Sequence, residues 1–161
     1  MQLQCISIDY EDEQHAKDLV NLLDDYAKDP MGGGQALAQD VKSKLPHALA
    51  NRGNAISVIA YADGHPAGLA NCFEEFSTFQ CKPIMNIHDL VVSVDYRGKG
   101  IAKKLLQKVE QIASNRGCCK LTLEVLDGNL VAKNAYFSFG FEGYQLDPQF
   151  GHAIFLEKPL N

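Results

Sequence analysis

The sequence lacks an apolar run of the roughly 20 residues that a membrane-spanning helix needs. Its first residues, Met1 to Cys5, lack the basic segment followed by an apolar segment that is typical of a secretory signal. Internal repeats, low-complexity tracts and Pro/Ser-rich linkers are also missing, so we expect one domain over residues 1–161. These absences predict a cytoplasmic protein that does not attach to a membrane.

An excess of positive charge is absent as well. The chain has 15 Lys and Arg against 20 Asp and Glu, which gives a formal net charge of −5 and a pI near 5.5. This is the wrong sign for a general nucleic-acid or anionic-membrane binder, so we expect neither partner. An anionic ligand would have to be held by a local concentration of cationic and backbone donor groups.

The cysteines do not form a recognisable framework. Their number is odd and no two are spaced as CxxC; the five are Cys5, Cys72, Cys81, Cys118 and Cys119. Disulfide sets and zinc sites need such spacing, so we expect buried free thiols in a reducing compartment and no metal. None has a nearby His in a catalytic pattern, which argues against a cysteine nucleophile.

Apolar periodicity and turn residues divide the chain into helices and strands. Asp63 and Gly64 are a hairpin signal between two strands, and Pro46 is expected to interrupt or kink the second helix. The order predicts an α/β (α+β) fold with a single mixed, mostly antiparallel sheet of about seven strands and about four helices on both faces. The expected strands are 3–8, 56–62, 67–76, 84–94, 120–126, 141–144 and 152–156, and the expected helices are 10–27, 36–50, 101–117 and 129–139.

The junction between the strand that ends near Val94 and the following helix is the most informative stretch. A glycine-containing turn before a helix directs free backbone N–H groups and the helix dipole at one point, which suits phosphate. Gly98 and Gly100 allow close approach of a ligand, and Lys103 adds charge. The segment fits neither the Walker loop nor the GxGxxG fingerprint, so ATP and NAD are disfavoured. An ordinary tight turn is the alternative interpretation.

Two motifs in the second half identify a family resemblance. The segment from Arg97 to Ala102 matches the pattern Q/R-x-x-G-x-G/A, and the segment from Asn129 to Phe141 matches N-x-x-A-x-x-x-Y-x-x-x-G-F. With both motifs in this order, residues 84–144 resemble the GNAT superfamily of acyl-CoA-dependent N-acyltransferases. The first half of the chain is similar to that family only in the order of its elements.

The resemblance implies acetyl-CoA as co-substrate. In this family the strand containing Leu90 to Val94 is splayed from its parallel neighbour, here 120–126, and the pantetheine arm lies in the gap. Backbone groups near Val92 and Val94 would bind the pantetheine, and the N–H groups from Gly98 to Lys103 would bind the pyrophosphate. The implied cofactor-binding residues are Leu90, Val91, Val92, Val94, Arg97, Gly98, Lys99, Gly100, Ile101, Ala102, Lys103, Asn129, Ala132 and Tyr136.

The resemblance also implies the proton-transfer groups. Tyr136 lies where the family often places a tyrosine that protonates the leaving thiolate, although a core aromatic at helical spacing is the alternative. His88 is the expected base, on the opposite strand face from Asp89; a purely structural His88 is the alternative. Asp89 is the rival base, and Glu74 and Glu75 are further candidates. The glycine-rich segment 30–34 would overhang the acceptor, with or without touching it.

The leading functional hypothesis is an N-acetyltransferase in which the primary amine of a small-molecule acceptor attacks acetyl-CoA directly in a ternary complex. A protein N-alpha or lysine acetyltransferase of the same fold is the alternative enzyme, and it would need an open groove for a peptide. A non-catalytic CoA-binding regulatory module is the alternative from another class. The sequence identifies neither the acceptor nor whether the chain forms a homodimer.

Overall fold

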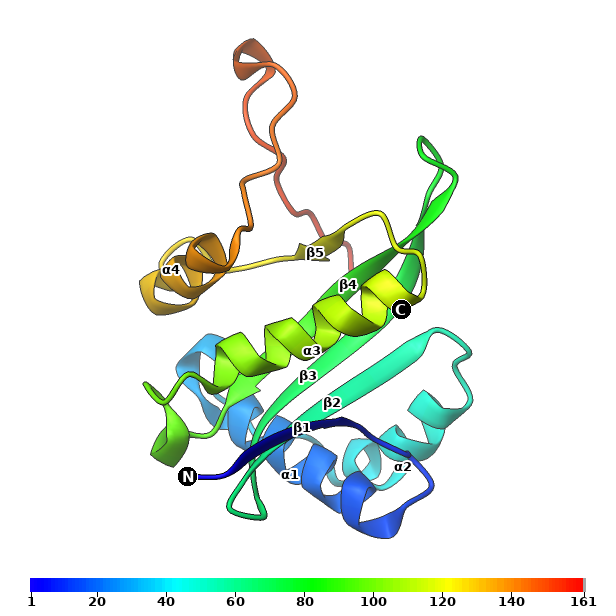
Figure 1. Cartoon of the computed structure of the whole chain (residues 1–161), viewed down its shortest axis with the longest axis vertical. Coiled ribbons are helices and arrows are strands. Elements are labelled where there is room, and N and C mark those ends of the chain that lie inside the picture. The colour runs from blue at the N-terminus through cyan, green and yellow to red at the C-terminus, as the bar shows by residue number, and fades with distance from the viewer. Residues whose placement is uncertain (161) are drawn as a thin grey trace.

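A five-stranded sheet in the order β1-β2-β3-β4-β5 forms the centre of the computed structural model, which describes residues 1–160 (Figure 1). Neighbours among the first four strands are antiparallel, whereas β5 runs parallel to β4. The strands are β1 (Leu3–Ser7), β2 (Ala55–Ala62), β3 (His65–Ser77), β4 (Lys82–Val92) and β5 (Leu121–Leu123). The expected mixed sheet with a parallel pair is therefore confirmed.

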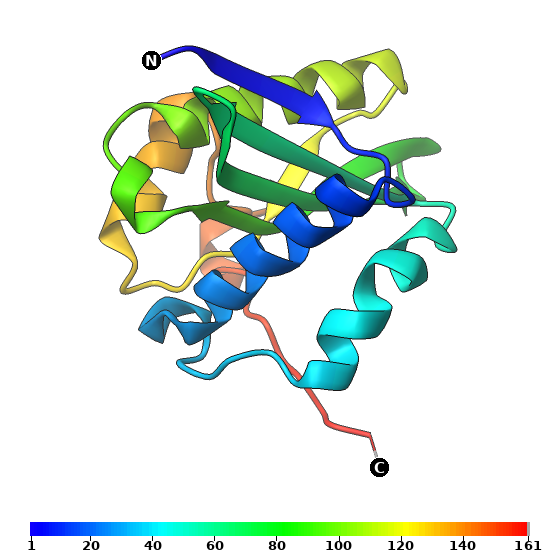
Figure 2. The same ribbon diagram turned by 90° about the horizontal axis from the view of Figure 1, so that it is seen from below.

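Helices cover both faces of the sheet (Figure 2). On one face α1 (Glu13–Lys28) and α2 (Gln39–Ala50) pack against the sheet through an apolar cluster that includes Leu19 and Leu49. On the other face α3 (Ile101–Asn115) and α4 (Leu130–Phe139) enclose the larger apolar cluster. Apolar periodicity located the first three helices, and the end signals Asn129 and Gly140 located α4, of which only Tyr136 is buried.

Pro46 does not interrupt α2, so the predicted interruption was wrong, while the predicted kink stays a prediction. The helix runs continuously from Gln39 to Ala50 with Pro46 inside it. A proline within the first turn removes only hydrogen bonds that the helix start can do without, but Pro46 lies deeper than this. Its side chain is half-buried, so packing of α2 against the rest of the layer compensates the lost backbone hydrogen bond.

The prediction of about seven strands was wrong by two, because the chain after α4 contains no strand within the described residues up to 160. In Figure 1 this segment rises away from the sheet, contains the 3-10 turn η3 (Pro148–Phe150) and then runs back down behind the sheet. Its apolar residues, among them Tyr144, Ile154 and Phe155, are exposed. Alternating apolar residues form a strand only beside another strand that completes their hydrogen bonds, and this segment has none within the described chain.

Two predicted strands end earlier than expected. The strand predicted for 84–94 stops at Val92, and Val94 lies in the following 3-10 turn η2 (Val94–Tyr96). The strand predicted for 120–126 keeps its pairing only over three residues, from Met85 with Leu121 to Ile87 with Leu123. Beyond that point β4 continues without β5 beside it. The parallel pair is therefore splayed after Ile87.

Candidate active site

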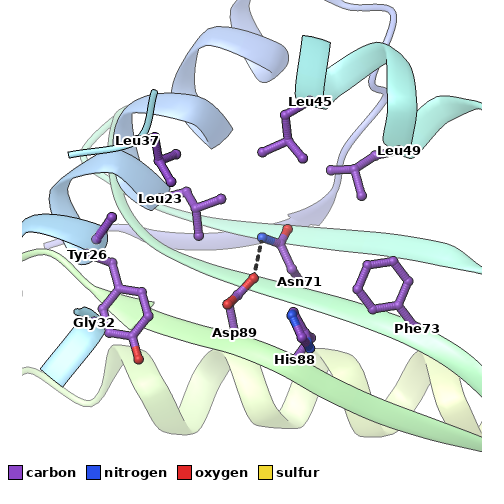
Figure 3. A pocket seen from close by; sticks show the side chains of 11 residues that line it. Leu23, Tyr26, Gly32, Leu37, Leu45, Leu49, Asn71, Phe73, His88 and Asp89 are labelled. Atoms are coloured by element: carbon purple, nitrogen blue, oxygen red, sulfur yellow. Dashed lines mark hydrogen bonds between the residues drawn. The ribbon is translucent and has the colours of Figure 1, made fainter. Parts of the chain in front are cut away.

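A cavity of about 320 Å³ lies between the α1–α2 layer and the strands β3 and β4 (Figure 3). Its size is at the lower end of the range for small-molecule sites. Apolar side chains dominate the walls, and the polar groups lie on the strands apart from the Tyr26 phenol of α1. The lining residues are Leu23, Tyr26, Ala27, Gly32, Leu37, Leu45, Leu49, Asn71, Phe73, His88 and Asp89.

A β-bulge brings His88 and Asp89 to the same cavity. Asn71 pairs with Asp89 and the next residue, Cys72, pairs with Ile87, so His88 has no partner opposite it on β3. In a regular strand these two neighbours would point to opposite faces, as we expected. The extra residue of a bulge turns the strand, and the prediction of opposite faces is corrected: both residues line the cavity.

Asp89 is held by a chain of hydrogen bonds that runs into the core. Its Oδ2 accepts a hydrogen bond from Nδ2 of Asn71 at 3.0 Å. The Oδ1 of Asn71 accepts from the Ser57 hydroxyl at 2.6 Å, and the Ser57 oxygen lies 2.9 Å from the Tyr10 hydroxyl. Because Asn71 and Ser57 are both buried, their mutual hydrogen bond fixes the amide orientation and presents its N–H group to the carboxylate.

His88 lies at the exposed rim of the same cavity. Its ring packs edge-on against Phe73, with centroids 5.6 Å apart and an interplanar angle of 77°. Figure 3 shows the imidazole beside Phe73 and close to Asp89. The contact with Phe73 orients the ring while leaving it accessible to a ligand.

Glu74 and Glu75 do not reach this cavity. The carboxylate of Glu74 forms an ion pair of 3.1 Å with Arg116. Glu75 is exposed and does not line the cavity. The structure therefore separates these two carboxylates from His88 and Asp89, with which the sequence had grouped them as candidate bases.

The glycine-rich segment 30–34 is an ordered turn at the edge of the cavity. Pro30 to Gly32 form the 3-10 turn η1, and the N–H groups of Gly32 and Gly34 both donate to the Asp29 carbonyl. A Cβ on Gly32 would lie 2.0 Å from the Tyr26 carbonyl oxygen, so only glycine allows the turn to pack against α1. Gly32 contributes to the cavity wall.

The splayed end of β4 leaves backbone groups without strand partners. Ser93 donates to the Ala67 carbonyl of β3, so in the antiparallel ladder the backbone groups of Leu90 and Val92 point away from β3. No described β5 residue pairs with them, because that pairing ends at Ile87. Arg97 donates to the Val92 carbonyl at 3.2 Å. Val91 is buried against β3 and α1, and Val94 is 69% exposed in η2.

The turn between η2 and α3 has the geometry of an anion cradle. Gly98 and Gly100 adopt left-handed conformations with φ of 74° and 79°, and no side chain caps the start of α3. The first hydrogen bond of α3 is donated by the Lys104 N–H group to the Gly100 carbonyl. The N–H groups of Ile101, Ala102 and Lys103 therefore have no acceptor within the helix. A phosphate group fits such a terminus.

The cationic side chains of this turn have different environments. Arg97 forms a 3.0 Å ion pair with Asp29 at the end of α1, and Lys99 donates to the Asp95 carbonyl at 2.9 Å. Lys103 and Lys104 are exposed. Arg97 therefore connects this turn to the α1–α2 layer, whereas the ammonium groups of Lys103 and Lys104 are accessible to a ligand.

Helix α4 presents the remaining motif residues. Asn129 caps the helix by accepting from the Ala132 N–H at 3.2 Å. Tyr136 is 9% exposed and packs edge-on against Phe141, with centroids 5.9 Å apart. Burial, and secondarily the nearby Tyr26, raises the pKa of Tyr136 to about 12. The Tyr136 phenol therefore stays protonated at every pH at which the protein is expected to work.

Sequence reasoning missed most of the cavity lining, including Tyr26, Asn71 and Phe73. Tyr26 continues the apolar stripe of α1, which predicts a core position. Burial, followed by the carboxylates of Asp89 and Asp29, raises the pKa of the Tyr26 phenol. Asn71 had a usable signal, because it is a lone amide within the apolar segment 69–73 of a strand.

The cysteines are all free thiols. Burial raises the pKa of the Cys72 thiol to about 12, and Cys5 and Cys118 are also shifted to a higher pKa by burial. Within residues 1–160, no three His, Cys, Asp or Glu side chains are grouped so that they could hold a metal ion. None of the helices in that range combines the length and the apolar composition needed to span a bilayer.

Comparison with known proteins relates this geometry to a family. Bovine (Bos taurus) thialysine N-epsilon-acetyltransferase is 33% identical over 90 residues, which cover 53% of this chain and 52% of that protein. Aminoglycoside N(6')-acetyltransferase type 1 of Salmonella typhimurium is 26% identical over 89 residues, covering 53% of this chain and 61% of that protein. The chain thus matches little more than half the length of these curated relatives.

The fold is similar to a solved structure of AAC(6')-Iy in complex with the bisubstrate analogue CoA-S-monomethyl-acetylneamine. The TM-score is 0.76 at 20% identity, with 99% of this chain and 100% of that chain covered. Residues 17–141 match the Acetyltransferase (GNAT) family. Because this match extends over more than half of the chain and agrees with its fold, the chain belongs to the Acetyltransferase (GNAT) family.

Proposed function

We propose that this protein transfers the acetyl group of acetyl-CoA to a primary amine of a small molecule. The observation that supports this best is the position of the cavity. His88 and Asp89 directly follow Ile87, the last β4 residue that pairs with β5. The acceptor cavity on the α1–α2 face therefore meets the splayed gap of β4 and β5 at residues 87–89. Direct attack in a ternary complex needs such a junction.

The described residues fit acetyl-CoA as co-substrate. The backbone groups of Leu90 and the N–H group of Val92 have no β5 partner and suit the amides of the pantetheine arm, whereas the Val92 carbonyl already accepts from Arg97. The left-handed Gly98 and Gly100 and the open start of α3 suit the pyrophosphate, with Lys103 as a nearby cation. When bound, acetyl-CoA supplies the acetyl group as a thioester.

Asp89 or His88 is the proposed base. An alkylammonium must lose a proton before its nitrogen can attack, and either side chain can accept that proton at the cavity. Asp89 is the better-positioned group, because Asn71 fixes its carboxylate through a 3.0 Å hydrogen bond. His88 lies beside it and is exposed, so it can pass the proton to solvent.

Tyr136 is the proposed acid. As the amine nitrogen bonds to the acetyl carbon, the carbon–sulfur bond breaks and the thiolate that leaves needs a proton. The buried Tyr136 phenol keeps its proton, since its pKa is raised to about 12. The raised thiol pKa of Cys72 gives no support to a cysteine nucleophile and so favours direct transfer.

Two alternatives carry less support. A protein N-alpha or lysine acetyltransferase needs room for an extended peptide, whereas helices α1 and α2 and the turn η1 wall this cavity on one side. A non-catalytic CoA-binding module would not need His88, Asp89 and Asn71 gathered at the junction. The curated relatives named above are small-molecule acetyltransferases by name, which agrees with the proposal.

A thiol-release assay tests the proposal. The protein is incubated with acetyl-CoA and a panel of primary amines, and mass spectrometry identifies the acetylated product. Amine-dependent thiol release with a matching N-acetyl product is the expected result. Faster acetylation of a lysine-containing peptide than of any small amine would favour the protein-modifying alternative. Absence of turnover with every amine and peptide, despite binding of acetyl-CoA, would favour the non-catalytic module.

A further inference from the structure

The acceptor cavity is mostly apolar; its polar groups are those of β3 and β4 and the Tyr26 phenol of α1. Leu23, Ala27, Leu37, Leu45, Leu49 and Phe73 form its walls from α1, the α1–α2 connection, α2 and β3. Asp89 is the single carboxylate among the described lining residues. Figure 3 shows Leu23, Leu45 and Leu49 on the helices and Asp89 with Asn71 on the strands, so the apolar and polar parts face one another across the cavity.

The acidic side chains nearest to this wall already have cationic partners. Asp24 accepts hydrogen bonds from Lys42 and the Leu37 N–H at 2.8 Å each, and its carboxylate lies 2.8 Å from Lys28. Asp29 is paired with Arg97 at 3.0 Å. A ligand ammonium group would have to displace one of these lysines or the arginine to reach either carboxylate. Among the described residues of the cavity, Asp89 therefore offers the one uncompensated negative charge.

We propose that the acceptor is a primary amine with a single positive charge on a compact apolar body. This inference rests on the proposed acetyl transfer and names its substrate class. The ammonium group binds at Asp89, which Asn71 holds in place, and the apolar body contacts Leu23, Leu45 and Phe73. A second ammonium group inside the cavity would be desolvated without a partner, which is costly. Polyamines and other polycations are therefore poor acceptors.

A matched pair of amines tests the substrate class. Butylamine and 1,4-diaminobutane have the same four-carbon body, and they differ in whether the far end carries a second ammonium group. The body is short enough for the far end to remain among the apolar walls. We expect kcat/KM per amino group to be at least about tenfold higher for butylamine, because an unpaired buried charge costs more than one factor of ten in binding.

A variant with a new carboxylate on the wall makes the test specific. Leu45 is half-buried on α2 and lines the cavity, so Leu45→Glu should be tolerated and should give the second ammonium group a partner. The ratio of kcat/KM for 1,4-diaminobutane over butylamine should rise about tenfold. Val41→Glu is the control, because Val41 is exposed one turn earlier on α2 and outside the cavity lining. That variant adds the same charge and should leave the ratio unchanged.

The outcomes separate this inference from the proposed function. Preference for the diamine by the unmodified protein, or an equal response of the ratio to Leu45→Glu and Val41→Glu, would overturn the substrate class while acetyl transfer to amines stands. Thiol release with neither amine, and with no other amine of the panel, would overturn the proposed function and this inference with it.

Discussion

At the scale of single residues, the environment of Tyr136 constrains its chemistry. Burial raises its pKa to about 12, so it can donate a proton but not act as a base near neutral pH. Its ring also fills part of the larger core cluster and packs against Phe141. The same side chain therefore supports both the fold and the proposed acid role, and a test has to separate these.

Removal of the phenol oxygen provides that separation. Tyr136→Phe keeps the aromatic ring, so the free energy of unfolding and the affinity for acetyl-CoA should change little. The turnover number should fall by roughly 10² to 10⁴, the usual contribution of a positioned acid. Steady-state kinetics from pH 6 to about 10 should show no recovery at alkaline pH, because alkaline solution does not supply a donor.

The pH profile of His88→Ala is the companion measurement. Loss of a base should be partly restored at high pH, where more of the amine is already unprotonated. Near-normal turnover by Tyr136→Phe would remove this tyrosine from the mechanism. A defect of His88→Ala that does not depend on pH would assign the base to Asp89.

The negative charge of Asp24 stabilises the helical wall of the cavity through its contacts with Lys28, Lys42 and the Leu37 N–H group. Hydrogen bonds from Lys28 and Lys42, and from the Leu37 N–H, lower the pKa of the Asp24 carboxyl well below its usual range. A carboxyl whose folded-state pKa is lowered stabilises the fold above its unfolded pKa of about 4 and loses that contribution as the pH falls toward the folded value.

Asp24→Asn should therefore lower the melting temperature at pH 7, and the difference from the unmodified protein should narrow below about pH 4. Thermal melts followed by circular dichroism between pH 3 and 8 give the measurement. Asp25→Asn serves as control, because Asp25 is 69% exposed and 3.8 Å from Lys28, and it should change the melting temperature much less. A difference in melting temperature that does not change with pH would mean that the charge of the Asp24 carboxylate does not contribute to stability.

At the scale of elements, the approach of α3 to the sheet depends on Gly68. A Cβ there would lie 2.8 Å from the Val91 carbonyl oxygen and 3.0 Å from side-chain atoms of Ile101 and Leu105. Residue 68 pairs with Val92, at the end of β4 where the pantetheine site is proposed. A larger side chain would push β4 and the start of α3 away from β3.

Gly68→Ala should destabilise the protein by about 1 to 3 kcal/mol, the usual cost of overpacking. Urea denaturation at equilibrium measures this loss as a lower transition midpoint. Gly53→Ala is the matched control, because a Cβ at Gly53 has no neighbour within 4 Å and its backbone is not left-handed. Equal midpoints for the two variants would show that the close approach at Gly68 is not needed.

The start of α3 can be tested with two substitutions at one position. Gly100 has φ of 79°, and a Cβ there would meet no atom within 4 Å, so Gly100→Ala and Gly100→Glu suffer the same backbone strain of roughly 1–2 kcal/mol. The glutamate adds a negative charge where the pyrophosphate is proposed to bind. Calorimetric titration should show weak acetyl-CoA binding by Gly100→Ala and none by Gly100→Glu. Similar binding by both would place the pyrophosphate elsewhere.

At the scale of the whole molecule, the two helical layers have different tasks. The α1–α2 layer encloses the cavity, and β4, the turn after it and the α3–α4 layer carry the residues proposed to bind acetyl-CoA. Arg97 links the layers through its ion pair with Asp29 and its hydrogen bond to the Val92 carbonyl. A ligand held between both layers should stabilise the complete domain rather than one part of it.

Acetyl-CoA should therefore raise the melting temperature of the whole domain. At about 100 times its dissociation constant it would stabilise the folded state by about 2.7 kcal/mol through mass action. ATP and NAD at equal concentration should have little effect, because the turn at residues 97–102 fits neither of their loop motifs. Differential scanning fluorimetry gives the shifts. An equal shift with ATP would indicate a general phosphate site.

The sequence alone determined the features that depend on neighbours along the chain. Amphipathic stripes located the first three helices, the Asp63–Gly64 turn located the β2–β3 hairpin, and the glycines at 98 and 100 located the left-handed turn before α3. Asn129 and Gly140 were correctly predicted at the two ends of α4. Each of these signals is local: a side chain's periodicity, a cap or a backbone conformation that glycine favours.

Only the tertiary structure decided what depends on residues far apart in the chain. The bulge that directs the side chains of both His88 and Asp89 toward one cavity depends on the pairing of β3 with β4. No feature of the β4 sequence alone reveals it. Glu74 was separated from the cavity by Arg116, which lies 42 residues away. The two predicted C-terminal strands have no pairing partner among the described residues, since a strand needs hydrogen bonds that a second segment must supply. Periodicity shows which face a residue occupies, whereas pairing and packing decide which residues meet.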